Sequence, residues 1–239
     1  MMALLEVKGL RGGYGTLPVL HDVDLEVQEG ETAVLLGSNG AGKTTTLLNI
    51  CGMNRPWGGS VNFSGQQIAG KDTSALVEAG IVLVPEGRHV FPAFNVVKNL
   101  QMGAWTKRKN PKFISERMEQ VFHYFPRLKE RSAQFAGTLS GGEQQMLAIG
   151  RGLMADPKLL MIDEASLGLS PVLASTVFKI VKQINADGVT VVLVEQNTGA
   201  VAIADKTYVM EKGRIVFSGS GSEVLDSPEI REAYLGLPA

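Results

Sequence analysis

The stretch from Gly37 to Thr45 constrains this chain more than any other. Its residues fit the pattern G-x-x-x-x-G-K-[ST]. The glycines allow successive backbone N–H groups to curl around an anion without a Cβ in the way. An apolar, β-prone run, Thr32–Leu36, precedes the stretch, and helical spacing over Lys43–Cys51 follows it. This order of buried strand, glycine-rich loop and helix predicts an α/β fold with a phosphate-binding loop.

The loop also predicts how a nucleotide would bind. The N-terminus of its helix supplies unpaired N–H donors and a partial positive charge, and both favour phosphate. We expect the Lys43 ammonium to reach the β- and γ-phosphates of a nucleoside triphosphate and the Thr44 hydroxyl to bind Mg²⁺. The residues of this loop that are expected to contact the nucleotide are Gly37, Ser38, Asn39, Gly40, Ala41, Gly42, Lys43, Thr44 and Thr45.

Composition argues against several classes of protein. With a net charge of −1, the chain lacks the basic excess of a nucleic-acid-binding protein, and the basic run Lys107–Lys109 is expected to be a solvated loop. The single cysteine, Cys51, excludes an internal disulfide and suits a reducing compartment. No apolar run approaches the ~18 residues that span a bilayer, and the N-terminus lacks a signal-peptide pattern. We therefore expect a cytosolic protein that reaches a membrane only through a partner.

Outside residues 86–136, apolar runs alternate with segments of helical spacing, as in an α/β core. Between the first two strands, Arg11–Gly15 is expected to be a turn-rich loop that presents Tyr14. Strands are expected at Ala3–Val7, Val19–Val27, Thr32–Leu36, Ser60–Phe63, Ile81–Val84, Lys158–Ile162, Val189–Val194, Thr207–Met210 and Arg214–Ser218. Helices are expected at Lys43–Cys51, Thr73–Ala79, Asn95–Ala104, Pro111–Phe125, Ser140–Ala155 and Pro171–Ala186, with a last one that begins at Ser227.

Residues 86–136 differ in character from the rest. Asn95–Ala104 and Pro111–Phe125 have helical spacing, and no strand candidate stands out between 86 and 136. We therefore predict a single domain over residues 1–239. In it, a mostly helical subdomain of residues 86–136 is inserted into an α/β core of residues 1–85 and 137–239.

Two carboxylates follow another buried strand. The apolar run Leu159–Ile162 leads directly into Asp163 and Glu164. Strands of open α/β sheets deliver such residues to their carboxyl edge, where ligands bind. We expect Asp163 to hold Mg²⁺ through water and Glu164 to polarise the attacking water. Gln196 follows the apolar strand Val189–Val194, so it is expected at the same edge, as a neutral hydrogen-bonding group beside the γ-phosphate.

A second pair of glycines precedes another predicted helix. Leu139–Gln145 reads Leu-Ser-Gly-Gly-Glu-Gln-Gln. A serine and two glycines at a helix start are features of an anion-binding N-terminus. One nucleotide held by Gly37–Thr45 needs no second cradle of this kind. The simplest physical account is that the second motif contacts a nucleotide bound to another protomer.

With these motifs, the sequence resembles the ABC ATPases over nearly its whole length. The resemblance implies a RecA-like P-loop NTPase core with an antiparallel β subdomain and an inserted α-helical subdomain that docks a membrane partner. It also implies a head-to-tail dimer with two ATP molecules, each between Gly37–Thr45 of one subunit and the second motif of the other. Tyr14 would stack on adenine. The residues implied on the second side of ATP are Ser140, Gly141, Gly142 and Glu143.

The resemblance is most specific to the ATPase subunits of branched-chain amino acid importers. Those subunits resemble this chain in Val84–Pro92, Val194–Asn197 and Glu232–Gly236. Most ABC ATPases carry Gln at the position of Glu86 and His at that of Gln196, and the importer branch shares both departures. The resemblance implies that Glu86 contacts the nucleotide and Mg²⁺.

Two other positions depart from the family pattern. Ala165 stands where a proline normally follows the catalytic Glu, and Ser170 stands where many relatives carry Asp in the loop that crosses the dimer. These departures leave open how the subunits communicate, whereas Lys43, Asp163 and Glu164 are retained.

The motifs and the resemblance together predict the ATP-hydrolysing subunit of an ABC importer for branched-chain or related amino acids. The resemblance implies ATP and Mg²⁺ as ligands, and a homodimer or a heterodimer with a sister ABC ATPase. It further implies permease subunits on the cytoplasmic face of the plasma membrane, and a periplasmic or surface solute-binding protein as an indirect partner. Exposed candidates for the permease contact are Phe91, Phe94 and Trp105; the alternative is that these rings form the subdomain's own core.

Two alternatives come from other functional classes. One is a soluble ABC-type ATPase that acts on nucleic acid or ribosomes, and the neutral charge and the lack of long coiled-coil or zinc-bearing inserts argue against it. The other is an ATP-dependent switch without a transport role. Pull-down of membrane subunits, or its failure, separates that switch from an importer subunit.

Overall fold

A six-stranded sheet forms the centre of the structure, a computed structural model that describes residues 3–226. Five of its strands run parallel, and only β10 pairs antiparallel, with β9. Because β3, β8 and β7 are neighbours, the residues that follow these strands meet at one edge. In spatial order the strands are β10 (Arg214–Gly219), β9 (Lys206–Glu211), β3 (Thr32–Leu36), β8 (Thr190–Glu195), β7 (Leu159–Asp163) and β6 (Ile81–Val84).

A second, antiparallel sheet packs on one side of the first. In spatial order it contains β2 (Leu17–Val27), β1 (Leu5–Tyr14), β4 (Gly58–Phe63) and β5 (Gln66–Gln67). The loop expected at Arg11–Gly15 is wrong, because β1 continues to Tyr14, which pairs with Leu17. Three register shifts between β1 and β2 let this glycine-rich end of β1 bend and still pair.

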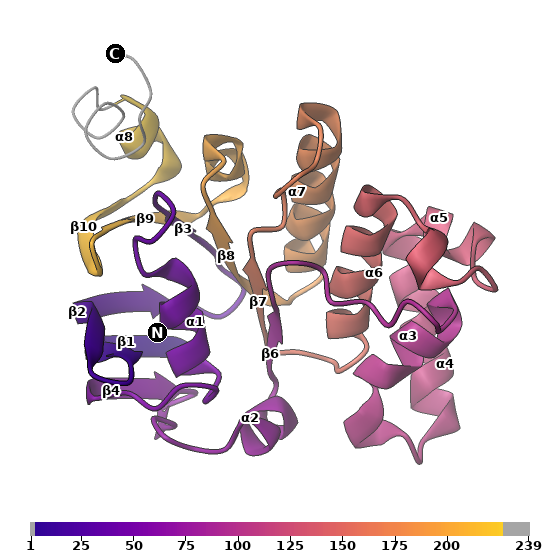
Figure 1. Ribbon diagram of the computed structural model, residues 1–239, viewed down its shortest axis with the longest axis horizontal. Helices are drawn as coiled ribbons and strands as arrows, with labels where there is room; N and C mark the ends of the chain where they lie inside the picture. The colour runs from indigo at the N-terminus through magenta and orange to yellow at the C-terminus, as the bar shows by residue number, and fades with distance from the viewer. Residues whose placement is uncertain (1–2, 227–239) are drawn as a thin grey trace.

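Helices cover both faces of the six-stranded sheet (Figure 1). α1 packs in the core shared with the antiparallel sheet, whereas α6 and α7 pack on the opposite face. The helices are α1 (Lys43–Ile50), α2 (Thr73–Ala79), α3 (Val96–Gly103), α4 (Pro111–Tyr124), α5 (Pro126–Glu130), α6 (Gly141–Leu153), α7 (Pro171–Ala186) and α8 (Gly221–Asp226), with 3-10 turns η1 (Trp105–Lys107), η2 (Ala136–Thr138) and η3 (Thr198–Ile203).

The central sheet divides the interior into two cores. Along β3, Ala33 and Leu35 face α1 and the antiparallel sheet, while Val34 and Leu36 face the helices on the other side. All five residues of β3 are buried, which explains why its sequence is continuously apolar rather than alternating. The phosphate loop therefore follows a strand that is packed on both faces.

Residues 86–136 contain α3, η1, α4 and α5 but no strand; one isolated bridge joins Asn95 to Phe135. They lie beside α6, to one side of the sheet (Figure 1). α3 and α4 begin at asparagine caps, because the side chains of Asn95 and Asn110 accept hydrogen bonds from the N–H groups of Lys98 and Phe113.

Two sequence features fall outside the described residues: the helix predicted to begin at Ser227 and the segment Glu232–Gly236. Within residues 3–226, no helix is both long enough and apolar enough to cross a membrane.

Candidate active site

The phosphate loop connects the carboxyl end of β3 to α1. Gly42, the residue before the helix, has a φ of 109°, a left-handed conformation that strains any residue with a Cβ. A Cβ at Gly37 would lie 2.5 Å from the carbonyl oxygen of Met210, so the loop also needs glycine there for space. No side chain caps α1, which leaves the donors of its first turn without a side-chain acceptor. This geometry suits an anion.

Lys43 is held inside the loop, with only 4% of its surface exposed. Its Nζ donates to the carbonyl oxygens of Gly37 at 2.8 Å and Ser38 at 3.1 Å. The same atom lies 3.3 Å from Oε1 of Glu164. A phosphate that enters the loop therefore meets a cation that is already in place.

Strands β7 and β8 end beside the loop and deliver three more side chains. Asp163 is the last residue of β7, Glu164 follows it, and Gln196 follows β8. Nε2 of Gln196 donates to Oε1 and Oε2 of Glu164 at 2.8 and 2.9 Å, and to Oδ1 of Asn39 at 2.7 Å. The structure thus brings together the phosphate loop, Glu164 and Gln196.

Asp163 is 2% exposed, and its Oδ1 has no hydrogen-bond partner within residues 3–226. Burial raises the pKa of the Asp163 carboxyl to about 6; a hydrogen bond with Thr44 opposes this rise, and the charges of Glu164 and Glu86 add to it. A buried carboxylate without a cation is unfavourable. A divalent cation at Asp163 and Thr44 would remove that cost, and oxygen ligands of this kind fit Mg²⁺.

Two more of the predicted residues lie at the rim of the cluster. Glu86 is exposed on the loop after β6, within range for its charge to act on Asp163. Tyr14 closes β1, and its hydroxyl lies 3.3 Å from Oγ1 of Thr45. The tyrosine is 49% exposed, and an exposed ring beside the phosphate loop suits stacking on a base.

The second motif lies away from this cluster, at the N-terminus of α6. Ser140 caps the helix and forms a capping box with Glu143, whose Oε2 accepts the Ser140 N–H at 2.9 Å. The other carboxylate oxygen lies 2.6 Å from Nε of Arg131. α6 packs in the core opposite to that of α1, and no hydrogen bond joins the two motifs within the described chain. The two motifs therefore belong to helices on opposite faces of the central sheet.

Two features beside the site were not predicted. Glu195, the last residue of β8, is buried and accepts hydrogen bonds from Ser166. Arg88 and His89 have φ angles of 66° and 43°, and their carbonyl oxygens accept hydrogen bonds from Arg151 of α6. Both features depend on contacts between residues far apart in the sequence, and no local motif signals them.

Comparison with known proteins places this geometry in a family. The profile of the family described as ABC transporter matches residues 20–167. The chain belongs to the ABC transporter family. It is 48% identical over 224 residues to the high-affinity branched-chain amino acid transport ATP-binding protein BraG of Pseudomonas aeruginosa. The matched residues make up 93% of this chain and 95% of BraG. It is 33% identical to the probable branched-chain amino acid transport ATP-binding protein LivF of Archaeoglobus fulgidus, over 98% of this chain and 99% of LivF.

Solved structures of ABC ATPases have the same fold. The ADP conformation of an ATP-binding cassette of an ABC transporter matches with a TM-score of 0.87 at 28% identity, over 97% of this chain and 98% of that one. This confirms the predicted ABC ATPase fold, and membership of the family makes the chain an ATPase. ABC ATPase subunits bind ATP and ADP and work at the membrane with partner ATPase and permease subunits.

Proposed function

We propose that this chain is the ATP-hydrolysing subunit of an ABC importer for branched-chain or related amino acids. The observation that carries the proposal is the 48% identity to BraG, which extends over 93% of this chain and 95% of that relative. A second relative from Pseudomonas aeruginosa, BraF, also named for branched-chain amino acid transport, is 30% identical over 98% of each chain. The names of these relatives support the class of solute, and the residues of the site support the hydrolysis of ATP.

The site residues offer a route to hydrolysis. Lys43 and the N–H groups of Gly37–Thr45 would hold the phosphates, with adenine stacked on Tyr14. Glu164 is the base that polarises the attacking water, a role that contributes ~10²–10⁴ in rate. Gln196, hydrogen-bonded to both oxygens of Glu164, would position that carboxylate and donate to the γ-phosphate.

We also propose a Mg²⁺ site formed by Asp163, Thr44 and Glu86. It is supported by the buried Oδ1 of Asp163, which lacks a hydrogen-bond partner in the described residues, and by the hydroxyl of Thr44 beside it. When bound with ATP, Mg²⁺ would neutralise charge on the phosphate oxygens. Asp163 would hold it through water.

A second subunit, identical or a sister ATPase, would complete each nucleotide site. Leu167, Val172 and Leu173 are apolar yet 46%, 76% and 39% exposed. Leu173 borders the second motif, since a Cβ at Gly142 would lie 3.2 Å from its Cδ1. Such an apolar rim is suited to burial against a partner. The residues that would then face the partner's ATP are Ser140, Gly141, Gly142 and Glu143.

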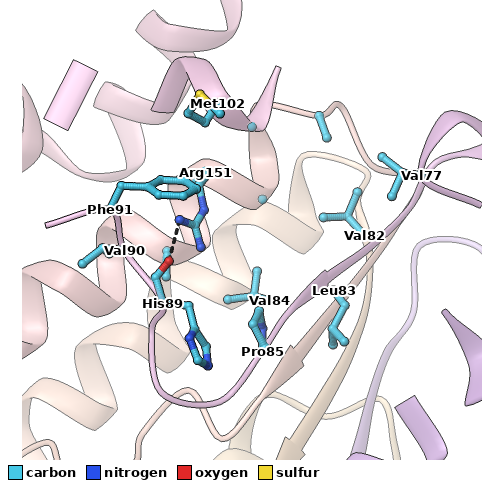
Figure 2. Close-up of a pocket in the computed structure, with 14 residues that line it drawn as sticks. Val77, Val82, Leu83, Val84, Pro85, His89, Val90, Phe91, Met102 and Arg151 are labelled. Carbon is cyan, nitrogen blue, oxygen red and sulfur yellow. Dashed lines mark hydrogen bonds between the residues drawn. The ribbon is translucent and has the colours of Figure 1, made fainter. Parts of the chain in front are cut away.

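The permease would dock on residues 86–136, which we propose as the inserted helical subdomain. A cavity of about 620 Å³ lies between β6, the loop that follows it, α3 and α6 (Figure 2). In it the Arg151 guanidinium stacks 5.2 Å from the centre of the Phe91 ring and donates to the His89 carbonyl at 2.7 Å, and burial lowers the pKa of Arg151. An apolar segment that carries one acidic side chain would suit this cavity.

Purification of the tagged chain from its host's membranes tests the proposal. We expect permease subunits to co-purify, and the complex to hydrolyse ATP faster with a branched-chain amino acid and its binding protein. Phe91→Asp should release the permease while the isolated chain hydrolyses ATP at the parent rate. A chain that hydrolyses ATP but retains no membrane subunit would favour the soluble switch. Loss of ATP binding in Phe91→Asp would show that the docking segment is misassigned.

A further inference from the structure

Glu195 is a buried carboxylate next to the site that the mechanism above does not use. It closes β8, one residue before Gln196, and is 1% exposed. Its Oε1 accepts the Ser166 N–H and its Oε2 accepts the Ser166 hydroxyl, both at 2.8 Å, and the Asn197 N–H lies 3.5 Å from Oε2. Burial raises the pKa of this carboxyl, so retaining it has a cost in stability.

Ser166 lies in the turn that follows Glu164, where the Leu167 N–H donates to the Glu164 carbonyl at 3.2 Å. Glu164 has a φ of 49°, a left-handed conformation that few residues other than glycine hold without support. The Glu164 N–H donates to the Val194 carbonyl at 2.9 Å, which ties the start of the turn to β8. The Ser166–Glu195 contacts tie a second point of the turn to the same strand.

The residue between Glu164 and Ser166 supports the turn through packing alone, since it is fully buried in the core. Ala165 is an alanine, which restricts neither its own φ nor the backbone of Glu164 in the way a proline would. Besides this packing and the hydrogen bond between Leu167 and Glu164, the turn is held by its two ties to β8. Since Gln196 follows Glu195 directly, the second tie also fixes the distance between the Glu164 turn and the Gln196 side chain.

We propose that Glu195 is a positioning residue for ATP hydrolysis. Through Ser166 it holds the left-handed Glu164 turn, so that the Glu164 carboxylate stays within reach of Gln196 and Lys43. Glu195 does not contact the reacting atoms itself and acts through Ser166. This inference rests on the proposed role of Glu164 as the base.

Steady-state kinetics of the purified chain test the inference. Glu195→Ala should lower kcat about 10- to 100-fold with KM for ATP within about 2-fold, because a displaced base slows chemistry more than it weakens binding. Ser166→Ala should lower kcat less, by about 3- to 10-fold, and should have no further effect in the Glu195→Ala background. Glu195→Gln should keep kcat within about 3-fold, since its amide can accept the Ser166 N–H and donate to the hydroxyl.

Ser220→Ala is a matched control. The N–H and hydroxyl of Ser220 donate to Oε2 of Glu223 at 2.6 and 2.9 Å, the same pair of contacts at the start of α8. Ser220→Ala should leave kcat at the parent value. Additive effects of Glu195→Ala and Ser166→Ala, or a parent-like kcat in either, would overturn the inference.

A folding check and a parallel assay of Glu164→Gln separate loss of folding, and loss of the base, from loss of the Glu195 contact. If Glu195→Ala does not fold, as judged by circular dichroism, Ser166→Ala still decides, because it changes one partly buried hydroxyl. Glu164→Gln is assayed in parallel. Near-normal turnover in that variant would reject Glu164 as the base, whereas an inactive Glu164→Gln beside a fully active Ser166→Ala would reject only the role of Glu195.

Discussion

Two helix N-termini of this molecule have sequences suited to phosphate, and they differ in whether a side chain of the same protein caps them. α1 begins after a left-handed glycine and has no side-chain cap. α6 begins with a serine cap and a capping box whose glutamate also pairs with Arg131. The N-terminus of α1 leaves its donors for a ligand, whereas that of α6 satisfies its first donors within the chain. We infer that the phosphate loop is completed by nucleotide and that the second motif is preformed before any partner arrives.

Lys43→Ala should have the largest effect and act on the α1 side only. It removes the cation that would pair with two phosphates, and each charged hydrogen bond contributes about 1.5–3 kcal/mol. We expect ATP affinity of the dilute, isolated chain to fall by about 10²–10⁴-fold in a fluorescent-nucleotide titration. Ser140→Ala should bind ATP as the parent does. Equal losses in both variants would contradict the division between the two helix ends.

Gln196→Ala should have the next largest effect, and it tests a donor whose hydrogen bonds are made within the chain. Gln196 already donates to Glu164 and Asn39, so its loss leaves ATP affinity nearly unchanged. The loss of one preorganised donor to developing charge lowers kcat by ~10²–10³. Gln196→Glu should be slower still, because it sets a second carboxylate against Glu164, whereas Gln196→His should keep substantial activity. Turnover within about 2-fold of the parent in Gln196→Ala would leave the side chain only a structural role.

Ser140→Ala should lower turnover by about 10- to 100-fold, the value of one hydrogen bond to a charged group. In the proposed dimer this hydroxyl contacts ATP held by the partner subunit. The specific ATPase activity of the unmutated protein should therefore also rise with protein concentration. Light scattering and ATPase assays over a dilution series check both statements. Activity that stays constant in a confirmed monomer would show that α6 contributes nothing across an interface.

The smallest effect concerns the charge on the α6 cap. Burial tends to raise the pKa of Glu143, but hydrogen bonds from the Ser140 hydroxyl and N–H, with Arg131, hold that pKa below its usual 4.5. A depressed carboxyl pKa stabilises the fold above pH 4.5 and loses this effect as pH falls through the folded-state value.

Glu143→Gln keeps the capping geometry and removes the charge. We expect it to lower the free energy of unfolding by ~0.3–1 kcal/mol at pH 7, since Arg131 is partly solvated, and to shift Tm by no more than about 4 °C. The difference should shrink as pH falls below 4.5 and vanish once Glu143 is protonated in the folded state. A difference that does not change with pH would place the stabilisation in packing rather than in charge.

The sequence predicted best what local patterns determine. β3, β7 and β8 are continuous apolar runs because both faces of the central sheet are covered, and the phosphate loop follows from its glycines and Lys43. The extension of β1 to Tyr14 was missed, because glycine-rich residues pair there through register shifts that no propensity indicates. The Glu195–Ser166 contact was missed for another reason: it joins residues 29 positions apart, and only tertiary packing brings them together.

The six-stranded sheet separates the two hydrophobic cores, so a substitution in one core should change the stability of the molecule independently of the other core. The phosphate loop and α1 depend on one core, whereas α6, α7 and the cavity beside Phe91 depend on the other. Substitutions in different cores share no partners, so their effects on stability should add. A substitution in the packing of the helical side should therefore leave the packing of the nucleotide side unchanged. The central sheet separates the stability of the two sides, while the strand ends that carry Glu164 and Gln196 belong to both.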